Sequence, residues 1–526
     1  MAGLPHIIEG LLSADAYPHA VENVELRQTH ISYLLFAGEF VYKVKKPVDL
    51  GFLDFSTLEK REHYCHEELR LNRRLCQRTY LDVVAIVSAS GEFKVEAEGE
   101  IVDYAVKMRR LPEEGMMTPM LARGGVTSAQ IADLGRRIAE FHAATERNDA
   151  TDELGGLKTI TLNWRENFEQ TEAYIGRTVT QQQFDEIRRF ANRTLAKEAS
   201  LFQQRVQEGR ARDCHGDLRA DAVCFEPDGV CIFDCIEFNE RFRRCDVAAD
   251  IAFLAMDLEF RGRQDLSDEL MASYLGVTLD STLPLLMPFY KCYRAYVRGK
   301  VDGFQLDQPE IGDAQKREVA EGARRFFALA QAYATQPAPP ALIVTIGVTG
   351  SGKSYLANGL AARIGAAVFS SDVLRKRLLD IEPTERHIDE IDSGVYSPES
   401  TEQTYRELLD QARPWLERGS PVLLDASYLR AEHRQAALRL AEETGVLFLA
   451  LECQADEALV RERLAERHGA EQVVSDGRWE VYQAQMERLQ PPDELPASAR
   501  ITVDSAQPLR IQIDGVVAAL ANAAND

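Results

Sequence analysis

The sequence predicts an α/β protein of two domains: an N-terminal α+β domain in two lobes, and a C-terminal domain built on a parallel β-sheet. A glycine-rich segment at 347–354 lies between an apolar, β-branched run at 342–346 and a helical pattern that follows it. Further apolar strands alternate with helical segments after this point, which is the order of a parallel sheet. Ahead of it, prolines within 335–340 interrupt regular structure, because proline lacks an N–H and cannot continue a helix.

The proline-rich segment is where we expect the domain boundary. The N-terminal domain would span 1–335, with a small β-rich lobe to about residue 110 and a helical lobe over 111–335. The C-terminal domain would span 341–526. With 526 residues the chain is too long for one ordinary core, which agrees with at least two domains.

Composition and charge exclude several classes of protein. Hydrophobic residues make up 45% of the chain and charged residues 28%, as in globular proteins. The chain has no long apolar run and no basic-then-apolar N-terminus, so we expect no membrane span and no signal peptide. The net charge of −23 repels long nucleic acids. Nine cysteines, an odd number without a CxxC pair, favour reduced thiols and a cytoplasmic location.

The glycine-rich segment fits the phosphate-binding pattern GxxxxGK[ST] at every defined position. Glycines let backbone N–H groups turn toward a polyphosphate, Lys353 would reach its β and γ phosphates, and Ser354 would hold Mg²⁺. A glycine-rich turn that binds nothing is the alternative, but strand, loop and helix occur in the order that the motif requires. The nucleotide-binding residues expected here are Gly347, Thr349, Gly350, Ser351, Gly352, Lys353 and Ser354.

Two aspartates follow apolar strands of the C-terminal domain, Asp372 after 366–371 and Asp425 after 421–424. Ligands of a parallel sheet bind at the carboxyl ends of its strands. We expect Asp372 to position and deprotonate an acceptor hydroxyl, with Arg375 holding an anionic part of the substrate. Asp425 would act on Mg²⁺ through water. Either aspartate could instead cap a helix.

Three arginines on a later helical segment, Arg461, Arg463 and Arg467, are candidates for a lid over the phosphates. Their spacing does not allow all three to face one way, so one or two would bind nucleotide and the rest would stay in solvent.

The small lobe carries a lysine and a glutamate that could act together. Lys43 lies in the strand 40–44, and Glu68 lies on a charged helical run. A strand lysine that meets a helix glutamate holds the α and β phosphates in kinase folds. Lys45 and Lys46 compete with Lys43 for this role, and each charge could instead be solvated.

The helical lobe contains the loop 214–222 with Asp217, followed by a hairpin that ends at Asp234. Phosphoryl transfer by a kinase fold uses two such carboxylates, one to accept the proton of the attacking hydroxyl and one to hold Mg²⁺. We assign Asp217 to the first role and Asp234 to the second. The alternative is an Asx-turn and a strand-end aspartate without catalytic roles.

Residues 28–330 resemble the aminoglycoside phosphotransferase family, which implies a bilobal kinase-like fold. In that family the loop continues to an asparagine, a second Mg²⁺ ligand, five residues after the aspartate. This chain has Ala222 there, so Asp221 or Glu237 would have to substitute if this lobe is active. The resemblance is carried by Val41-Tyr42-Lys43, Glu68, His215-Gly216-Asp217 and Asp234.

Residues 342–520 resemble the P-loop kinases typified by polynucleotide 5′-hydroxyl kinase, zeta-toxin and gluconate kinase, most clearly through Ser371, Asp372 and Arg375. The run 233–239 is similar to a bacterial branch of the phosphotransferases that is fused to such a domain. The resemblance implies the type of reaction and leaves the acceptor open.

Together these features predict a phosphotransferase that depends on ATP and Mg²⁺, with the C-terminal domain as the main catalyst. We expect a small hydroxylated acceptor. The alternatives are a nucleic-acid 5′ end as acceptor, as in a polynucleotide kinase, and a regulatory ATPase that transfers no phosphate and carries a pseudokinase N-terminal domain. The sequence leaves open the oligomeric state, the choice of ATP over GTP and the coupling of the two sites.

Overall fold

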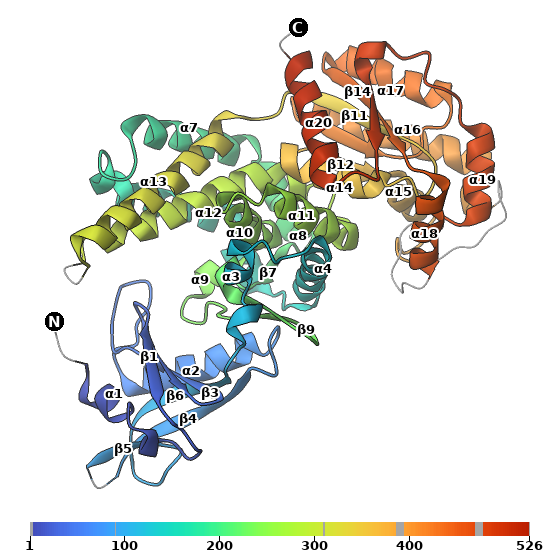
Figure 1. The fold of residues 1–526 in the computed structure, drawn as a ribbon. Helices are drawn as coiled ribbons and strands as arrows, with labels where there is room; N and C mark the ends of the chain where they lie inside the picture. The colour runs from blue at the N-terminus through green and yellow to red at the C-terminus, as the bar shows by residue number, and fades with distance from the viewer. Residues whose placement is uncertain (1–3, 90, 309–310, 386–393, 469–476, 525–526) are drawn as a thin grey trace.

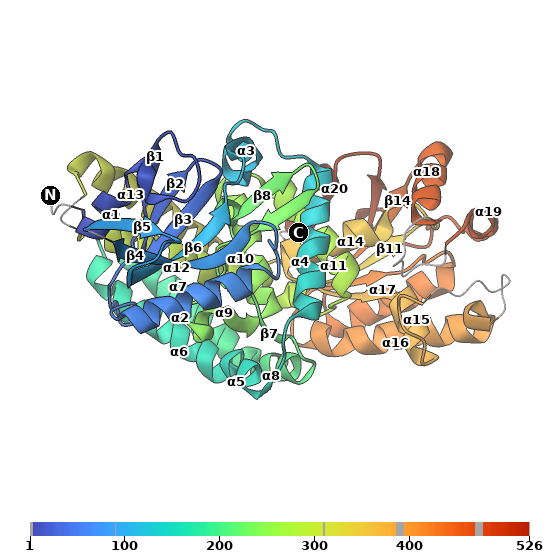
Figure 2. The ribbon, with the colours of Figure 1, turned by 90° about the horizontal axis from the view of Figure 1, so that it is seen from below.

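The computed structural model describes residues 4–89, 91–308, 311–385, 394–468 and 477–524. Figure 1 shows a β-sheet lobe at the lower left, a helical lobe above it and a C-terminal α/β domain at the upper right. In Figure 2 the β-sheet lobe overlaps the helical lobe on the left, and the C-terminal domain lies on the right. The predicted fold class is confirmed: a bilobal kinase-like domain is joined to a P-loop domain with a parallel sheet.

The small lobe is a six-stranded antiparallel sheet in the order β1-β2-β3-β6-β4-β5, with α2 packed on β6 and β4. The turn between β2 and β3 needs Gly38, whose φ of +61° is the left-handed conformation that glycine adopts without strain. Thr57 caps α2 by accepting from the Lys60 N–H. The elements are α1 (His6–Gly10), β1 (Val24–Gln28), β2 (Ser32–Ala37), β3 (Phe40–Lys45), α2 (Leu58–Asn72), β4 (Tyr80–Ala89), β5 (Glu92–Val95) and β6 (Glu100–Arg109).

The helical lobe is organised around α10, in which every residue from 247 to 258 is buried. A helix that is apolar on nearly all sides needs partners on all sides, and α11, α12 and α13 supply them. Two short pairs of antiparallel strands, β7 with β10 and β8 with β9, flank the loops that contain Asp217 and Asp234. The helices are α3 (Met117–Ala122), α4 (Ser128–Ala144), α5 (Asp149–Leu154), α6 (Leu157–Thr171), α7 (Gln181–Lys197), α8 (Ala199–Gln207), α9 (Glu240–Arg243), α10 (Val247–Phe260), α11 (Gln264–Thr278), α12 (Leu283–Gln305) and α13 (Asp313–Thr335), and the strands are β7 (Ala211–Asp213), β8 (Val223–Glu226), β9 (Gly229–Ile232) and β10 (Arg244–Asp246).

The C-terminal domain has a five-stranded parallel sheet in the order β12-β13-β11-β14-β15. All six residues of the central strand β11 are buried, which explains its continuous apolar run. The apolar runs at 342–346, 366–371 and 421–424 correspond to β11, β12 and β13, whereas β15, which is only partly buried, was not predicted. The strands are β11 (Ala341–Ile346), β12 (Ala367–Ser370), β13 (Val422–Asp425), β14 (Leu447–Gln454) and β15 (Arg500–Asp504), and the helices are α14 (Lys353–Ile364), α15 (Ser371–Leu378), α16 (Pro398–Glu417), α17 (Ala431–Thr444), α18 (Glu457–His468), α19 (Trp479–Arg488) and α20 (Leu509–Ala523).

The two domains are packed together through α14, the helix that follows the glycine-rich loop, and α11 of the helical lobe. Arg363 Nε donates to Asp268 Oδ1 at 2.9 Å across this junction. Ala362 belongs to the hydrophobic core of the helical lobe. Because α13 ends at Thr335 and β11 begins at Ala341, we keep the proposed boundary between these residues.

One cysteine pair differs from the expectation of reduced thiols. Cys76 and Cys231 form a disulfide that joins the segment between α2 and β4 of the small lobe to β9 of the helical lobe. No local pattern indicates this pair, because 155 residues separate its members. The other seven cysteines are unpaired. Among the helices that the structure describes, none has the length and apolar character needed to cross a bilayer.

Candidate functional site

The glycine-rich loop between β11 and α14 has the backbone that a phosphate cradle needs. Gly347, Gly350 and Gly352 have φ values of +149°, +80° and +88°, which residues with a Cβ rarely adopt. A Cβ on Gly350 would lie 2.8 Å from Val460. Lys353 Nζ donates to the Val348 carbonyl at 2.7 Å, so the ammonium lies across the loop.

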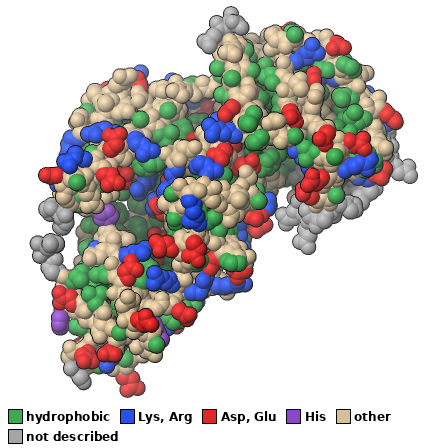
Figure 3. Space-filling model, viewed as in Figure 1, with side chains coloured by type: hydrophobic (Ala, Val, Ile, Leu, Met, Phe, Trp, Pro, Cys, Tyr) green, Lys and Arg blue, Asp and Glu red, His purple; other side chains and the backbone are tan. Residues whose placement is uncertain are grey.

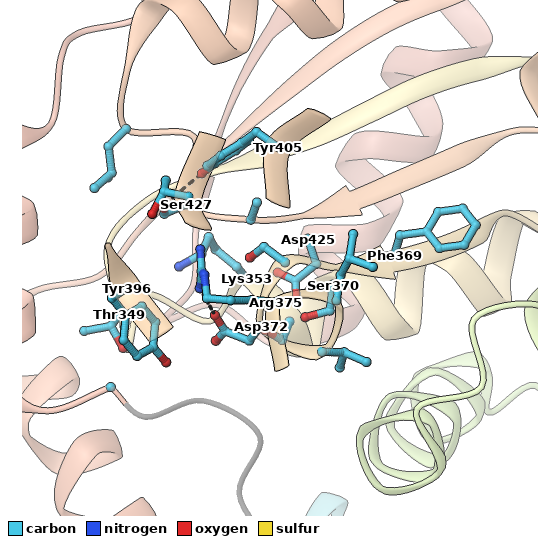
Figure 4. A pocket seen from close by; sticks show the side chains of 18 of the residues that line it. Thr349, Lys353, Phe369, Ser370, Asp372, Arg375, Tyr396, Tyr405, Asp425 and Ser427 are labelled. Carbon is cyan, nitrogen blue, oxygen red and sulfur yellow. Dashed lines mark hydrogen bonds and ion pairs between the residues drawn. The ribbon is translucent and has the colours of Figure 1, made fainter. Parts of the chain in front are cut away.

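Asp372, Arg375 and Asp425 meet the loop in one cavity of about 450 Å³ at the carboxyl edge of the sheet (Figure 4). Arg375 Nη1 donates to Asp372 Oδ1 at 3.1 Å, and its guanidinium lies over the Tyr396 ring. Arg375 is only 7% exposed and its Nε makes no hydrogen bond within the described residues. Asp425, the last residue of β13, is also 7% exposed.

Most of the predicted nucleotide-binding residues line this cavity. Gly347 and Ser351 do not; Ser351 is almost fully buried behind the loop. The cavity is lined by Thr349, Gly350, Gly352, Lys353 and Ser354 from the loop and the start of α14.

The lid arginines of α18 have different surroundings. Arg461 pairs with Glu457 at 2.8 Å and stacks on Trp479, with its side chain half exposed, and it does not line the cavity. Arg463 packs behind the loop, where Nη1 donates to the Gly350 carbonyl at 3.3 Å. Arg463 therefore supports the loop in this structure. The side chain of Arg467 lies outside the described residues.

The structure adds residues that no motif indicated. Gln485 of α19 accepts from the Thr349 N–H at 2.6 Å. The Ser427 carbonyl accepts from the Gly347 N–H at 3.0 Å. The hydroxyl of Ser427 lies 3.2 Å from the hydroxyl of Tyr405. These residues hold the loop from segments far along the chain, so local patterns carry no signal for them.

In the N-terminal domain, the geometry distinguishes among the three lysines. Lys43 Nζ lies 2.7 Å from Glu68 and faces the interlobe cavity. Lys45 is 1% exposed and enclosed between Glu68 and Glu237. Lys46 points to the surface and donates to the Thr29 carbonyl. Burial opposes ionisation of Glu68, but the two lysines outweigh it and lower its pKa to about 2.

Asp217 and Asp234 line the same interlobe cavity, which has a volume of about 1150 Å³. Figure 3 shows this face of the molecule hollowed between the β-sheet lobe and the helices above it. Asp234 has a φ of +64°, a strained conformation for a residue with a Cβ, and its carboxylate lies 2.7 Å from Lys43. That ammonium holds the pKa of Asp234 below its usual range.

Arg219 pairs with Asp217 through two hydrogen bonds of 3.1 and 3.0 Å. Burial alone would raise the pKa of Asp217, but the Arg219 guanidinium keeps it below its usual range. A carboxylate with a lowered pKa is a weaker base, so Asp217 in this conformation is poorly suited to remove a proton until Arg219 turns to another anion.

Asp250 of α10 fixes the loop that carries Asp217. Its carboxylate accepts from the N–H groups of His215 at 3.0 Å and Gly216 at 2.8 Å. His142 lies 3.1 Å from the same carboxylate and in turn contacts the Tyr274 hydroxyl at 2.8 Å. All of these residues are buried, so the loop conformation is set by a network that reaches α11.

Neither candidate for the second Mg²⁺ ligand is available in this conformation. Asp221 is held by Thr118, Arg219 and Arg261, and it does not line the cavity. Glu237 lines the cavity but pairs with Lys45, and burial raises its pKa. Asp234 lines the cavity and is paired with Lys43, and its role as a metal ligand stays a prediction.

The folds and the cavities define a protein with two kinase-type domains, one of the phosphotransferase class and one of the P-loop class. Residues 52–285 match the model of the phosphotransferase enzyme family, and residues 342–492 match that of an AAA domain. The chain is 33% identical over 458 residues to the uncharacterized protein Rv2004c of Mycobacterium tuberculosis and to Mb2027c of Mycobacterium bovis, covering 87% of this chain and 89% of each relative. It belongs to the family of these proteins.

Solved structures resemble each domain separately. A gluconokinase from Sinorhizobium meliloti is 24% identical with a TM-score of 0.26, covering 35% of this chain and 94% of that chain. A choline/ethanolamine kinase family protein from Mesorhizobium loti is 12% identical with a TM-score of 0.38, covering 62% of this chain and 98% of that chain.

Proposed function

We propose that the protein is a cytoplasmic phosphotransferase that depends on ATP and Mg²⁺ and transfers the γ-phosphoryl group to a hydroxyl, with the C-terminal domain as its main catalyst. The observation that carries the proposal is the meeting of Lys353, Asp372, Arg375 and Asp425 in one cavity. These are the groups that phosphoryl transfer needs: a cation for the phosphates, a carboxylate near the acceptor and a carboxylate near the metal ion.

Each residue has a role that its position allows. Lys353 would turn from the Val348 carbonyl to the β and γ phosphates. Asp372 would accept the proton of the attacking hydroxyl once Arg375, which pairs with it here, turns to an anionic part of the substrate. Ser354 and Asp425 supply hydroxyl and carboxylate oxygens to the same cavity, which are the ligands that Mg²⁺ prefers, so the donor set fits this ion. Bound there, Mg²⁺ would neutralise charge on the phosphates.

A small hydroxylated molecule is the acceptor that we propose, because a cavity of about 450 Å³ bounds its size. A nucleic-acid 5′ end remains the second candidate, and the net charge of −23 weighs against a long polyanion. In the N-terminal domain we propose a second kinase site of lower activity, with Asp217 as base and Asp234 as metal ligand. The ion pair between Asp217 and Arg219 makes Asp217 a weaker base, which supports a lower activity for the N-terminal domain.

Transfer of labelled γ-phosphate from ATP to sugars, sugar acids, antibiotics and oligonucleotides tests the proposal. Lys353→Ala should abolish most of the transfer, and Asp217→Ala should remove at most a second, smaller activity. Release of inorganic phosphate without any labelled acceptor would instead indicate a regulatory ATPase. Lys158→Met, which replaces an exposed lysine on α6, serves as the control for effects of mutation and purification that are unrelated to the site.

A further inference from the structure

The N-terminal cavity continues past Asp217 into a space between α6 and α12. Arg294 of α12 donates to the Gly216 carbonyl at 3.0 Å, so α12 lies directly behind the loop that carries Asp217. A general base must lie within hydrogen-bond reach of the hydroxyl that it deprotonates, so an acceptor for Asp217 would occupy the part of the cavity next to it. The side chains that line it come from α6, α9 and α12 and include Asn163, Glu166, Asn167, Arg241, Tyr293 and Lys300.

Lys300 is a cation of this space without a carboxylate partner within the described residues. Its ammonium donates to Asn167 Oδ1 at 2.6 Å and to Gln170 Oε1 at 2.8 Å, both of them neutral amides. The neighbouring carboxylate of Glu166 is bound by both terminal nitrogens of Arg241, at 2.9 and 2.7 Å. Burial lowers the pKa of Lys300 to about 8, which shows that its charge is poorly compensated.

Asn167 adds a second donor at the same place. An ammonium can only donate hydrogen bonds, so the amide oxygen must face Lys300 and the amide nitrogen must point elsewhere. That nitrogen is almost fully enclosed, since Asn167 is only 4% exposed, and the Asn167 side chain interacts with the hydroxyl of Tyr293, which lines the same cavity. A hydroxyl is a weaker acceptor than an anion, so a carboxylate or phosphate oxygen of a ligand would be the stronger partner for this donor.

We propose that Lys300 and Asn167 form an anion-binding subsite, and that the N-terminal site takes a hydroxylated molecule with a carboxylate or phosphate group. The lining side chains of α6, α9 and α12 in this space include four cations, Arg241, Arg294, Arg298 and Lys300, and one carboxylate, Glu166, so the space repels a polycation such as an aminoglycoside. The inference rests on the proposed kinase function for calling this molecule the acceptor. The binding itself can be measured without transfer.

Calorimetric titration of the full-length protein tests the subsite with four probes: gluconate, glucose 6-phosphate, glucose and glucosamine. We expect gluconate or glucose 6-phosphate to bind at least about tenfold more tightly than glucose, and glucosamine to bind no better than glucose. Lys300→Met should remove this preference. Lys300→Arg, which keeps the charge, should retain part of it. Lys158→Met, which changes an exposed lysine in the first turn of α6 that does not line the cavity, is the matched control.

The P-loop domain can bind anions as well, so dependence on Lys300 decides the result. Loss of anion affinity in Lys300→Met, with an unchanged unfolding temperature, supports the subsite. Equal anion affinity in wild type and Lys300→Met overturns it, as does tighter binding of glucosamine than of gluconate. If anions bind through Lys300 but Asp217→Ala leaves all phosphoryl transfer unchanged, the subsite stands and the proposed N-terminal kinase activity fails.

Discussion

The ammonium of Lys43 lies 2.7 Å from the carboxylate of Asp234, so a strand of the small lobe is tied directly to the end of a hairpin in the helical lobe. In the proposed reaction these two groups have different partners, a phosphate for Lys43 and a metal ion for Asp234. Nucleotide with its metal ion would therefore replace this ion pair, and the two lobes would be held together through the ligand.

Lys45 should matter more for stability than Lys43. Lys45 is enclosed by Glu68 and Glu237, so Lys45→Met would leave a buried carboxylate without its cation and cost about 3 kcal/mol of unfolding free energy. Lys43→Met leaves Glu68 paired with Lys45 and should cost about 1 kcal/mol, while weakening nucleotide binding to this domain. Urea unfolding of both variants measures the difference, and a larger loss for Lys43→Met would contradict the assignment.

Glu68 should make stability depend on pH at the acid end. Its pKa is lowered to about 2 in the folded protein, against about 4.3 in an unfolded chain. A carboxylate whose pKa is lower in the folded state stabilises the folded protein fully at any pH above its pKa in the unfolded chain. This contribution is lost as the pH falls from about 4.5 toward 2. Above this pH range, the contribution of Glu68 to the free energy of unfolding is about 3 kcal/mol.

Comparison with Glu68→Gln isolates this contribution from those of other carboxylates. The stability difference between wild type and variant should narrow as the pH is lowered from 5 to 3 in chemical unfolding experiments. A difference that stays constant over this range would show that the two lysines do not hold Glu68 in its ionised form.

Asp250→Asn should destabilise the helical lobe and loosen the loop with Asp217. The change keeps the size of the side chain but removes the charge that holds the N–H groups of His215 and Gly216. We expect a loss of about 2–4 kcal/mol in unfolding free energy. Asp149→Asn, an exposed carboxylate in the first turn of α5, should change stability by less than about 0.5 kcal/mol. Equal effects of the two variants would exclude an anchoring role for Asp250.

Arg363 should couple the unfolding of the two domains. Arg363→Met leaves Asp268, a buried residue of α11, without its guanidinium partner, which should cost about 3 kcal/mol. Calorimetry should then show the C-terminal domain unfolding at a lower temperature than the N-terminal domain. Arg510→Met removes a half-exposed pair with Asp514 and should have almost no effect. A single unshifted transition in Arg363→Met would contradict the coupling.

Anion binding to the N-terminal domain should weaken at high pH. The pKa of Lys300 is lowered to about 8, and only the charged form attracts an anion. Affinity for gluconate should therefore be full below about pH 7 and fall as pH rises through 8 to 9. Glu166 and Arg241, the charged groups that face Lys300, do not change charge in this range. Titration calorimetry at three pH values, with Lys300→Arg as a variant that should stay pH-independent, checks this.

The sequence by itself determined the P-loop, the strand-end aspartates and the domain order, because each is a local pattern of glycines, apolar runs and prolines. Tertiary structure decided which groups meet. Lys43 and Lys45 lie on β3 and Lys46 directly follows it, and only packing against Glu68 and Glu237 enclosed Lys45 and turned Lys43 to the cavity.

The same reason explains what the sequence could not show. Lys300 and Asn167 are 133 positions apart, and Cys76 and Cys231 are 155 apart. Periodicity and turn residues report on neighbours within a few positions, whereas contacts over such separations depend on how whole helices and strands pack.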